Sequence, residues 1–189
     1  MGKIQIRMAT LKDAQELLEI YRPYVEESAV SFEYTLPSIE EFGERMEKIL
    51  TKFPYLVAEQ EGMLVGYAYA SAFHSRAAYE WCVETTIYLR QGWSGKGLGK
   101  CLYQELERIL KMQNIKNLNA CIAYKEEEDE YLTHQSRDFH EHMGYRLVGE
   151  FRDCGYKFGR WYSMIWMEKM IDEHEEVPEK VIPITELKM

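Results

Sequence analysis

Apolar and polar residues alternate in short runs along this chain, and stretches with a different spacing separate those runs. Alternation over a few residues is typical of a strand with one buried face. Gln60–Gly62 lies between the second and third runs, so we expect a hairpin there, and Gly155–Gly159 is the expected turn region between the last two. The seven predicted strands are Ile4–Met8, Tyr55–Glu59, Met63–Ala72, Cys82–Leu89, Leu118–Tyr124, Arg146–Phe151 and Trp161–Lys169.

Apolar residues three and four apart predict four helices between these strands. Thr10 and Ser38 are the expected N-caps of the first two, in the capping-box manner. Asn114 is the expected end of the third helix, and Gly144 that of the fourth. The predicted helices are Ala14–Tyr21, Phe42–Leu50, Leu98–Met112 and Ser136–His142. The order strand, two helices, three strands, helix, strand, helix, two strands predicts a mixed α/β fold.

Composition limits the partners of the chain. Its 189 residues suit one domain, and the net charge of −9 argues against nucleic acid or an anionic membrane surface as a partner. No apolar stretch approaches the ~20 residues needed to cross a bilayer, and Met1–Gln5 contains no signal-peptide core. We therefore expect a cytoplasmic protein with one domain over residues 1–171. The acidic, proline-containing tail, residues 172–189, is expected to lie outside the core.

Cysteine and histidine spacing indicates neither a disulfide framework nor a metal site. The four cysteines form no Cys-x-x-Cys pair and sit in apolar segments, which predicts free, buried thiols. His140 and His142 are too close for helical metal ligands, which fall four residues apart. We expect no metal, and no cysteine lies in a recognisable nucleophile setting.

A glycine-rich turn follows the strand that ends at Leu89 and precedes the third helix. Such a turn lets the backbone approach a phosphate, and the helix N-terminus offers it unpaired N–H groups. A Walker loop is excluded because Leu98-Gly99 stands where Lys-Ser/Thr is needed, and a dinucleotide fingerprint is excluded because Lys100 takes the place of the last glycine. The alternative is a turn that merely connects strand to helix. The glycines are Gly92, Gly95, Gly97 and Gly99.

Gly97-x-Gly99 at a helix start resembles the Arg/Gln-x-x-Gly-x-Gly/Ala pyrophosphate loop of the GNAT acetyltransferases. Ser94 stands where that pattern has Arg or Gln, which would weaken one contact. The resemblance covers residues 4–170 and implies the GNAT fold, a mixed, mostly antiparallel sheet of about seven strands flanked by helices. It implies acetyl-CoA as co-substrate. The implied contacts are Ser94, Gly95, Lys96, Gly97, Leu98, Gly99 and Lys100 for pyrophosphate, and the backbone of Ile87, Tyr88 and Leu89 for pantetheine and the thioester carbonyl.

Five further segments resemble the phosphinothricin acetyltransferase branch of this family. Tyr79–Tyr88, for example, is similar to its strand Ala-Tyr-Asp-Trp-x-x-Glu-x-Thr-x-Tyr. The match implies transfer of acetyl to the amine of a small amino acid or analogue, of the phosphinothricin or methionine sulfone type. It also implies a homodimer. The other four segments are Ser28-x-x-x-Phe32, Pro54–Glu59, Phe139–Tyr145 and Gly155–Trp161.

Amine acetylation needs a base, because an amine is mostly ammonium at neutral pH. The resemblance assigns this role to Glu84, whose pKa we expect desolvation in an apolar strand to raise. It assigns His140, four residues before Gly144, as donor to the leaving thiolate. Direct transfer in a ternary complex is expected. The alternatives are a solvent-facing carboxylate for Glu84 and a polar capping residue for His140.

Acceptor contacts follow from the resemblance as well. Arg76 would pair with a substrate carboxylate, and Tyr79, Phe32 and Tyr34 would line the same pocket. The alternatives are an exposed loop arginine and ordinary core aromatics.

The segment before the fourth helix departs from the family pattern. Thr133 and Ser136 occupy the place of an Asn-x-x-Ser turn whose Asn contacts the cofactor, so Thr133 replaces that Asn. Tyr124–Thr133 is longer than in the family. Its charge run, Lys125–Glu130, is expected to be a solvated loop. Two other functions stay open: acetylation of a cationic amine (polyamine, aminoglycoside or protein amine), and a non-catalytic acyl-CoA-binding module.

Overall fold

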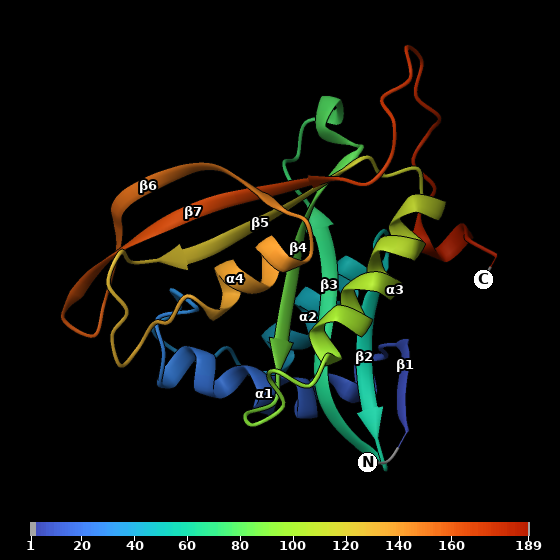
Figure 1. Ribbon diagram of the computed structural model, residues 1–189. Coiled ribbons are helices and arrows are strands. Elements are labelled where there is room, and N and C mark those ends of the chain that lie inside the picture. Colours follow the sequence, from blue (N-terminus) through green and yellow to red (C-terminus); the bar gives the residue numbers. More distant parts are fainter. Residues whose placement is uncertain (1–2, 189) are drawn as a thin grey trace. The chain divides into compact units, whose positions relative to one another are not determined.

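The computed structural model describes residues 3–188, so Met1, Gly2 and Met189, the ends of the predicted domain and tail, lie outside it. The seven predicted strands are confirmed, in the sheet order β1-β2-β3-β4-β5-β7-β6 (Figure 1). The pairs β1-β2, β2-β3, β3-β4 and β6-β7 are antiparallel, as expected for a mostly antiparallel sheet. The chain divides into two compact units. The first holds residues up to Ile20, Pro37–Leu118 and residues from Met170; the second holds Tyr21–Leu36 and Asn119–Lys169.

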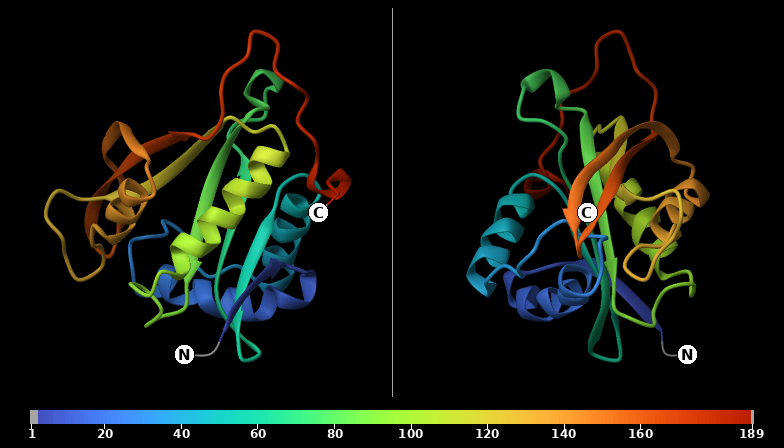
Figure 2. Two further views of the ribbon diagram at one scale, coloured as in Figure 1. Left: turned by 45° about the vertical axis from the view of Figure 1, so that its right-hand side comes forward. Right: turned by 90° about the vertical axis from the view of Figure 1, so that its left-hand side faces the viewer.

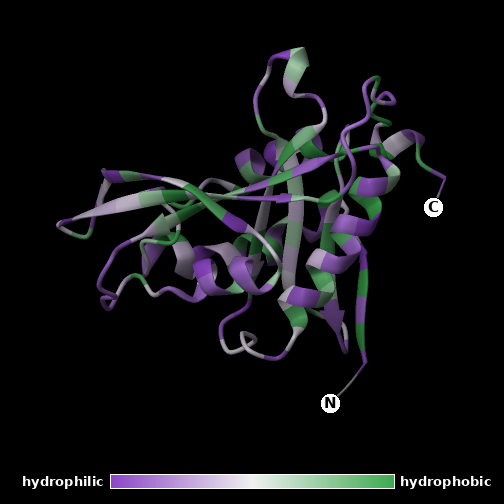
Figure 3. Cartoon of the chain, turned by 45° about the horizontal axis from the view of Figure 1, so that its top comes forward, coloured by the Kyte–Doolittle hydropathy of each residue, from purple (hydrophilic) through white to green (hydrophobic). Residues whose placement is uncertain are grey.

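The first unit is built on four strands: β1 (Ile4–Met8), β2 (Tyr55–Gln60), β3 (Met63–Ala72) and β4 (Cys82–Leu89). Helices α2 (Ile39–Leu50) and α3 (Leu98–Met112) pack against β2 and β3 from opposite faces (Figure 2). Hydrophilic and hydrophobic positions alternate along α3 (Figure 3), and its apolar side is buried. Burial of that side is the main force that holds the helix on the sheet.

The predicted helix caps of this unit are confirmed. Thr10 forms a capping box with Asp13 before a short 3-10 turn (Leu11–Asp13) that leads into α1, and the Ser38 hydroxyl accepts from Glu41 N–H at 3.1 Å. Asn114 follows α3 with a positive φ of 67°, the left-handed conformation typical of a residue just after a helix.

Helix α1 (Ala14–Glu26) is longer than predicted. The predicted end at Tyr21 was wrong, because the helix runs on through Pro23. Proline removes only its own N–H donor, and its carbonyl still accepts from Glu27 N–H at 3.0 Å. The helix therefore continues for a further turn.

The second unit contains most of β5 (Asn117–Tyr124), α4 (Gln135–His142), β6 (Arg146–Lys157) and almost all of β7 (Arg160–Met170). The predicted end of β6 at Phe151 was wrong, because pairing with β7 resumes at Gly155 after an irregularity. The hairpin turns at Phe158 and Gly159, both with positive φ, the conformation of a tight type I′ turn.

Two surface expectations also need correction. The charge run is not simply solvated: the Asp129 carboxylate is 8% exposed, pairs with Lys125 and Arg160, and accepts N–H bonds from Tyr131 and Leu132. In the described part of the chain the four cysteines are free, as predicted, but three are exposed, at positions on the outer sides of their elements: Cys101, Cys121 and Cys154.

The tail is partly in the core, contrary to expectation. Ile184 is 7% exposed, and its N–H bonds the carbonyl of Lys52 at 3.0 Å. Ile182 N–H bonds the carbonyl of Gln113 at 3.1 Å. The side chain of Ile184 and these two backbone bonds hold the segment on the first unit. Among residues 3–188, no helix is both long and apolar enough to cross a bilayer.

Candidate active site

The predicted pyrophosphate loop joins β4 to α3 in the first unit. Gly92, Gly95 and Gly97 have φ values of 79°, 75° and 78°, which other residues adopt at a cost. A Cβ added to any of these three would meet no described atom within 4 Å, so the loop faces open space. Gly97 caps α3, whose first-turn N–H groups lack helical partners. This arrangement suits the binding of an anion such as pyrophosphate.

Arg90, the first residue of this loop, is anchored in a way that the sequence did not reveal. Its Nε donates to the carbonyl of Leu64 at 2.7 Å and its Nη2 to Glu16 at 3.0 Å. Glu16 in turn accepts from the Leu64 N–H at 2.8 Å. The loop thus starts from a fixed point on β3 and α1. The only sequence signal was a charged residue directly after a strand.

Glu84 lies on β4, opposite Ser71 of β3 and five residues before Leu89, about 17 Å along the strand. Its side chain is partly buried, and desolvation raises the pKa of its carboxyl, in the expected direction. The next residue, Thr85, points to the opposite face and bonds Tyr103 of α3. Glu84 therefore faces away from α3, with a carboxyl that holds a proton more readily than usual.

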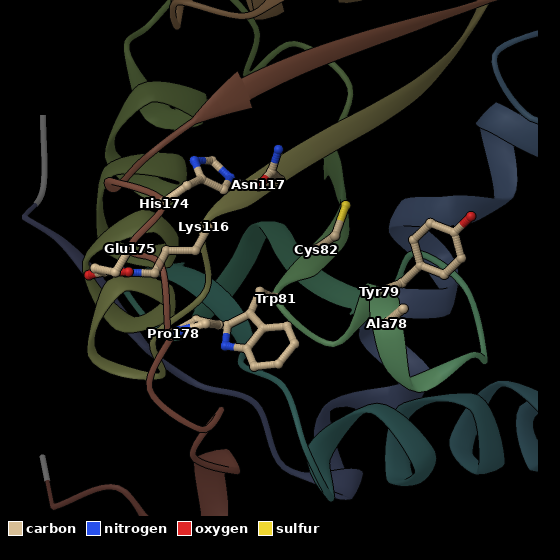
Figure 4. Close-up of a pocket in the computed structure, with 9 residues that line it drawn as sticks. All are labelled: Ala78, Tyr79, Trp81, Cys82, Lys116, Asn117, His174, Glu175 and Pro178. Carbon is tan, nitrogen blue, oxygen red and sulfur yellow. Dashed lines mark hydrogen bonds and ion pairs between the residues drawn. The ribbon is translucent and has the colours of Figure 1, made fainter.

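The segment that precedes β4 contains Arg76 and the 3-10 turn Ala77–Tyr79, so it lies at the opposite end of that strand from the glycine loop. Figure 1 shows this segment and the loop at the two ends of β4. Arg76 caps a 3-10 turn, and the Tyr79 ring meets Phe73 and His74 edge-on. Tyr79 also borders a pocket of about 320 Å³ (Figure 4). The pocket is lined by residues of the turn, β4, β5 and the tail: Ala78, Tyr79, Trp81, Cys82, Lys116, Asn117, His174, Glu175 and Pro178.

The tail closes this pocket. Trp81 Nε1 donates to the carbonyl of Glu179 at 2.6 Å, and the buried Lys116 ammonium pairs with Asp172 at 2.7 Å and Glu175 at 3.0 Å. Sequence reasoning missed these contacts, because it expected the tail to lie outside the core.

His140 lies in α4 of the second unit and is 3% exposed. Its Nδ1 is 2.7 Å from the carbonyl oxygen of Ser136. A carbonyl only accepts, so Nδ1 carries the proton and Nε2 of the neutral ring is an acceptor. Burial lowers the pKa of His140 to about 4, so the ring is neutral at pH 7. The predicted donation to a thiolate needs the protonated ring, which is rare under these conditions.

Four further predicted residues, Thr133, Ser136, Phe32 and Tyr34, also belong to the second unit, whereas the predicted contacts from Ile87 to Lys100 belong to the first. Thr133 is exposed just before α4, and Ser136 is partly buried in its first turn. Phe32 and Tyr34 follow α1; the Phe32 ring lies against Gly155, and the Tyr34 hydroxyl donates to the carbonyl of Tyr156. The structure therefore brings Phe32 and Tyr34 together on β6.

Comparison with known proteins agrees with this architecture. The family model of the acetyltransferase (GNAT) domain matches residues 6–166. The chain is 32% identical over 184 residues to the phosphinothricin N-acetyltransferase of Streptomyces viridochromogenes, covering 97% of this chain and 96% of that protein. It is 27% identical over 170 residues to the L-methionine sulfoximine/L-methionine sulfone acetyltransferase of Salmonella typhimurium, covering 89% and 95%.

A solved structure is similar over nearly the whole chain. The GNAT superfamily phosphinothricin acetyltransferase of Sinorhizobium meliloti, in complex with AcCoA, superposes with a TM-score of 0.85 at 34% identity, covering 96% of this chain and 97% of that one. The predicted fold and family are confirmed, and the chain belongs to the GNAT acetyltransferase family.

Proposed function

We propose that this protein is an acetyl-CoA-dependent N-acetyltransferase that acts on the amine of a small amino acid or analogue, of the phosphinothricin or methionine sulfone type. The near full-length similarity to acetyltransferases named for these compounds supports the acceptor class. The observation that carries the chemistry is Glu84, a partly buried carboxyl with a raised pKa on the strand that leads into the glycine loop.

Glu84 acts as the general base in this proposal. The acceptor enters mostly as ammonium, and nitrogen attacks only after that proton leaves. A carboxyl with a raised pKa takes up the proton more readily than an exposed one. The proton moves from the amine nitrogen to the Glu84 carboxylate, directly or through water.

Acetyl-CoA supplies the acetyl group as a thioester. The loop and first turn of α3, residues 94–100, hold the pyrophosphate with backbone N–H groups. The backbone of Ile87, Tyr88 and Leu89 holds the pantetheine and polarises the carbonyl. Thr133 and Ser136 are proposed as further contacts. Transfer is direct, with both substrates bound together.

His140 stays in the proposed catalytic set, with a changed expectation for its ring. The bond from Nδ1 to Ser136 leaves Nε2 as an acceptor at neutral pH. This favours a role in which Nε2 first takes the second amine proton from the tetrahedral intermediate and then passes it to the departing thiolate, instead of starting as an imidazolium.

The acceptor site is proposed to contain Arg76, Tyr79, Phe32 and Tyr34. Arg76 pairs with the carboxylate of the acceptor, and each of the three aromatic rings is a proposed contact of the acceptor. Exposure of Tyr79 at 37%, Phe32 at 38% and Tyr34 at 67% is consistent with rings that meet a ligand.

We further propose a homodimer in the cytoplasm, with the catalytic domain at residues 1–171. Edge strand β6 and its partner β7 expose large apolar side chains, and an exposed apolar edge strand favours pairing with another chain. Four free cysteines suit a reducing compartment. The exposed residues are Leu147, Val148, Phe151, Tyr156 and Trp161.

A panel of amines tests the function. The protein is mixed with acetyl-CoA and each amine in turn, and thiol release is followed together with mass detection of the acetylated product. Methionine sulfone and phosphinothricin are expected to turn over well. Strong turnover of spermidine, an aminoglycoside or a peptide amine with none of methionine sulfone would reassign the acceptor. Tight acetyl-CoA binding without turnover of any amine would contradict catalysis altogether.

A further inference from the structure

Lys157, near the end of β6, is a buried cation with three partners. Lys157 belongs to the second unit, and the residue is only 5% exposed. Nζ donates to the backbone carbonyls of Val25 at 2.7 Å, Ser28 at 2.8 Å and Ser31 at 2.6 Å. An ammonium has three N–H donors and no acceptor, so these bonds use its full capacity.

The three carbonyls belong to one stretch of backbone. Val25 lies in the last turn of α1, where carbonyls lack helical partners and a positive charge is favourable. Ser28 and Ser31 belong to the segment 27–34, which forms neither helix nor strand. Lys157 therefore fixes where this irregular segment leaves the helix.

The two residues before Lys157 contact the same segment. A Cβ on Gly155 would lie 2.3 Å from Cε2 of Phe32, so only glycine lets the ring pack there. The carbonyl of Tyr156 accepts the Tyr34 hydroxyl. Three consecutive residues of β6 thus contact one segment: Lys157 binds it where it leaves α1, Gly155 lies against Phe32, and Tyr156 accepts from Tyr34.

We propose that Lys157 is a positioning residue for the acceptor site: it holds segment 25–34 in the conformation that presents Phe32 and Tyr34 to the acceptor. This inference rests on the proposed function for its kinetic part, because Phe32 and Tyr34 are acceptor contacts only in that proposal. Its structural part is independent of that proposal.

The geometry argues against a direct catalytic or ligand-binding role for this lysine. All three of its protons are directed at main-chain oxygens, and the side chain is buried. A lysine that paired with a substrate carboxylate would have to give up one of these bonds and leave a buried carbonyl unsatisfied.

The test compares Lys157→Met and Lys157→Arg with wild type, with Lys48→Met as control. Met keeps the aliphatic length and has no donors, and Arg keeps the charge in a planar fork that cannot converge on three carbonyls. Lys48 is an exposed lysine of α2 in the first unit. Hydrogen exchange of peptides from 25–34 is measured without ligands, and KM is measured for methionine sulfone and for acetyl-CoA.

Both Lys157 variants should lose amide protection in 25–34 and raise the acceptor KM by about 10- to 100-fold. The acetyl-CoA KM should stay within about twofold, because the glycine loop is untouched. Lys48→Met should resemble wild type. Unchanged exchange in both variants overturns the proposal, whether or not any amine turns over. Lost protection with an unchanged acceptor KM also overturns it.

Gly155→Ala is a second variant that tests the proposal if neither Lys157 variant folds. The added methyl displaces the Phe32 ring while Lys157 stays intact. It should raise the acceptor KM selectively, and an unchanged acceptor KM counts against the proposal. A wild-type protein that acetylates no amine refutes the proposed function instead. The exchange data alone then test whether Lys157 holds segment 25–34 in place.

Discussion

One carboxylate oxygen of Glu16, in α1, accepts from both the guanidinium of Arg90 and the backbone N–H of Leu64, at 3.0 and 2.8 Å. Arg90 also donates to the carbonyl of Leu64, so the two side chains together bind both backbone groups of this residue of β3. The residues are 74 positions apart in the chain. Their contact fixes the point at which β4 passes into the glycine loop.

Removal of this anchor should weaken acyl-donor binding selectively. Glu16→Ala deletes the shared acceptor and should raise the KM for acetyl-CoA by about 2- to 10-fold, with the acceptor KM unchanged. Steady-state kinetics with each substrate varied in turn measures this. Glu105→Ala is the control, because it breaks an exposed ion pair with Arg108 on α3. Equal acetyl-CoA KM values in all three proteins would show that the anchor is dispensable.

Two glycine-to-alanine changes should have opposite effects on thermal stability. Gly97 has a φ of 78°, and an alanine in that conformation costs about 1–2 kcal/mol. Gly43 lies within α2, where an added Cβ meets no described atom, so alanine there should stabilise by roughly 0.5–1 kcal/mol. Tm is expected to fall by a few degrees for Gly97→Ala and to rise slightly for Gly43→Ala. Shifts of the same sign would contradict the conformational account.

His140 should make the protein less stable in mild acid. Burial lowers its pKa from 6.5 to about 4 in the folded state, so between these values only the unfolded chain takes up the proton. The free energy of unfolding should therefore fall as pH falls through this window, by roughly 3 kcal/mol in total. Urea unfolding from pH 7.5 to 4 measures it.

The His140→Asn variant separates this effect from the titration of carboxylates. Asn keeps an N–H donor for Ser136 and does not titrate, so the variant should lose much less stability over the same window. Equal losses in the two proteins would show that His140 contributes nothing to the pH dependence.

The tail should contribute to stability through one buried side chain. Ile184→Ala removes an apolar group that is 7% exposed, and should cost about 2–4 kcal/mol. Val177→Ala, at a side chain that is 84% exposed, should change stability by less than about 0.5 kcal/mol. Denaturant unfolding compares the two. A similar small effect for both would place the tail outside the folded core after all.

Local patterns were enough to predict most of the fold. The strands β1, β3 and β4 and the caps at Thr10 and Ser38 depend on residues close together in sequence. The end of β6 was missed because its pairing resumes only after an irregular stretch, which no alternation marks. The tail was misjudged because the partner of Ile184, the carbonyl of Lys52, lies far away in sequence.

The candidate site divides in the same way. The glycine loop could be predicted, since positive φ and a following helix start are local properties with a clear signal. The bonds from Arg90 to Glu16 and from Lys157 to Val25 could not be predicted, because a charged residue gives no sign in sequence of a partner 74 or 132 positions away. Which ring nitrogen of His140 carries the proton could be assigned only from the position of the Ser136 carbonyl.

The central claim, that Glu84 is the base of an amine acetyltransferase, is tested most directly by the pH–rate profile of Glu84→Gln. Glutamine keeps the shape but cannot take the proton, so the rate on methionine sulfone should fall by roughly 10²–10⁴-fold near neutral pH. The defect should shrink as pH approaches the pKa of the amine, and acetyl-CoA affinity should hardly change. Glu47→Gln, at an exposed carboxyl of α2, is the control and should match wild type. Near-normal turnover of Glu84→Gln at pH 7 would contradict the claim and make Glu84 a structural residue.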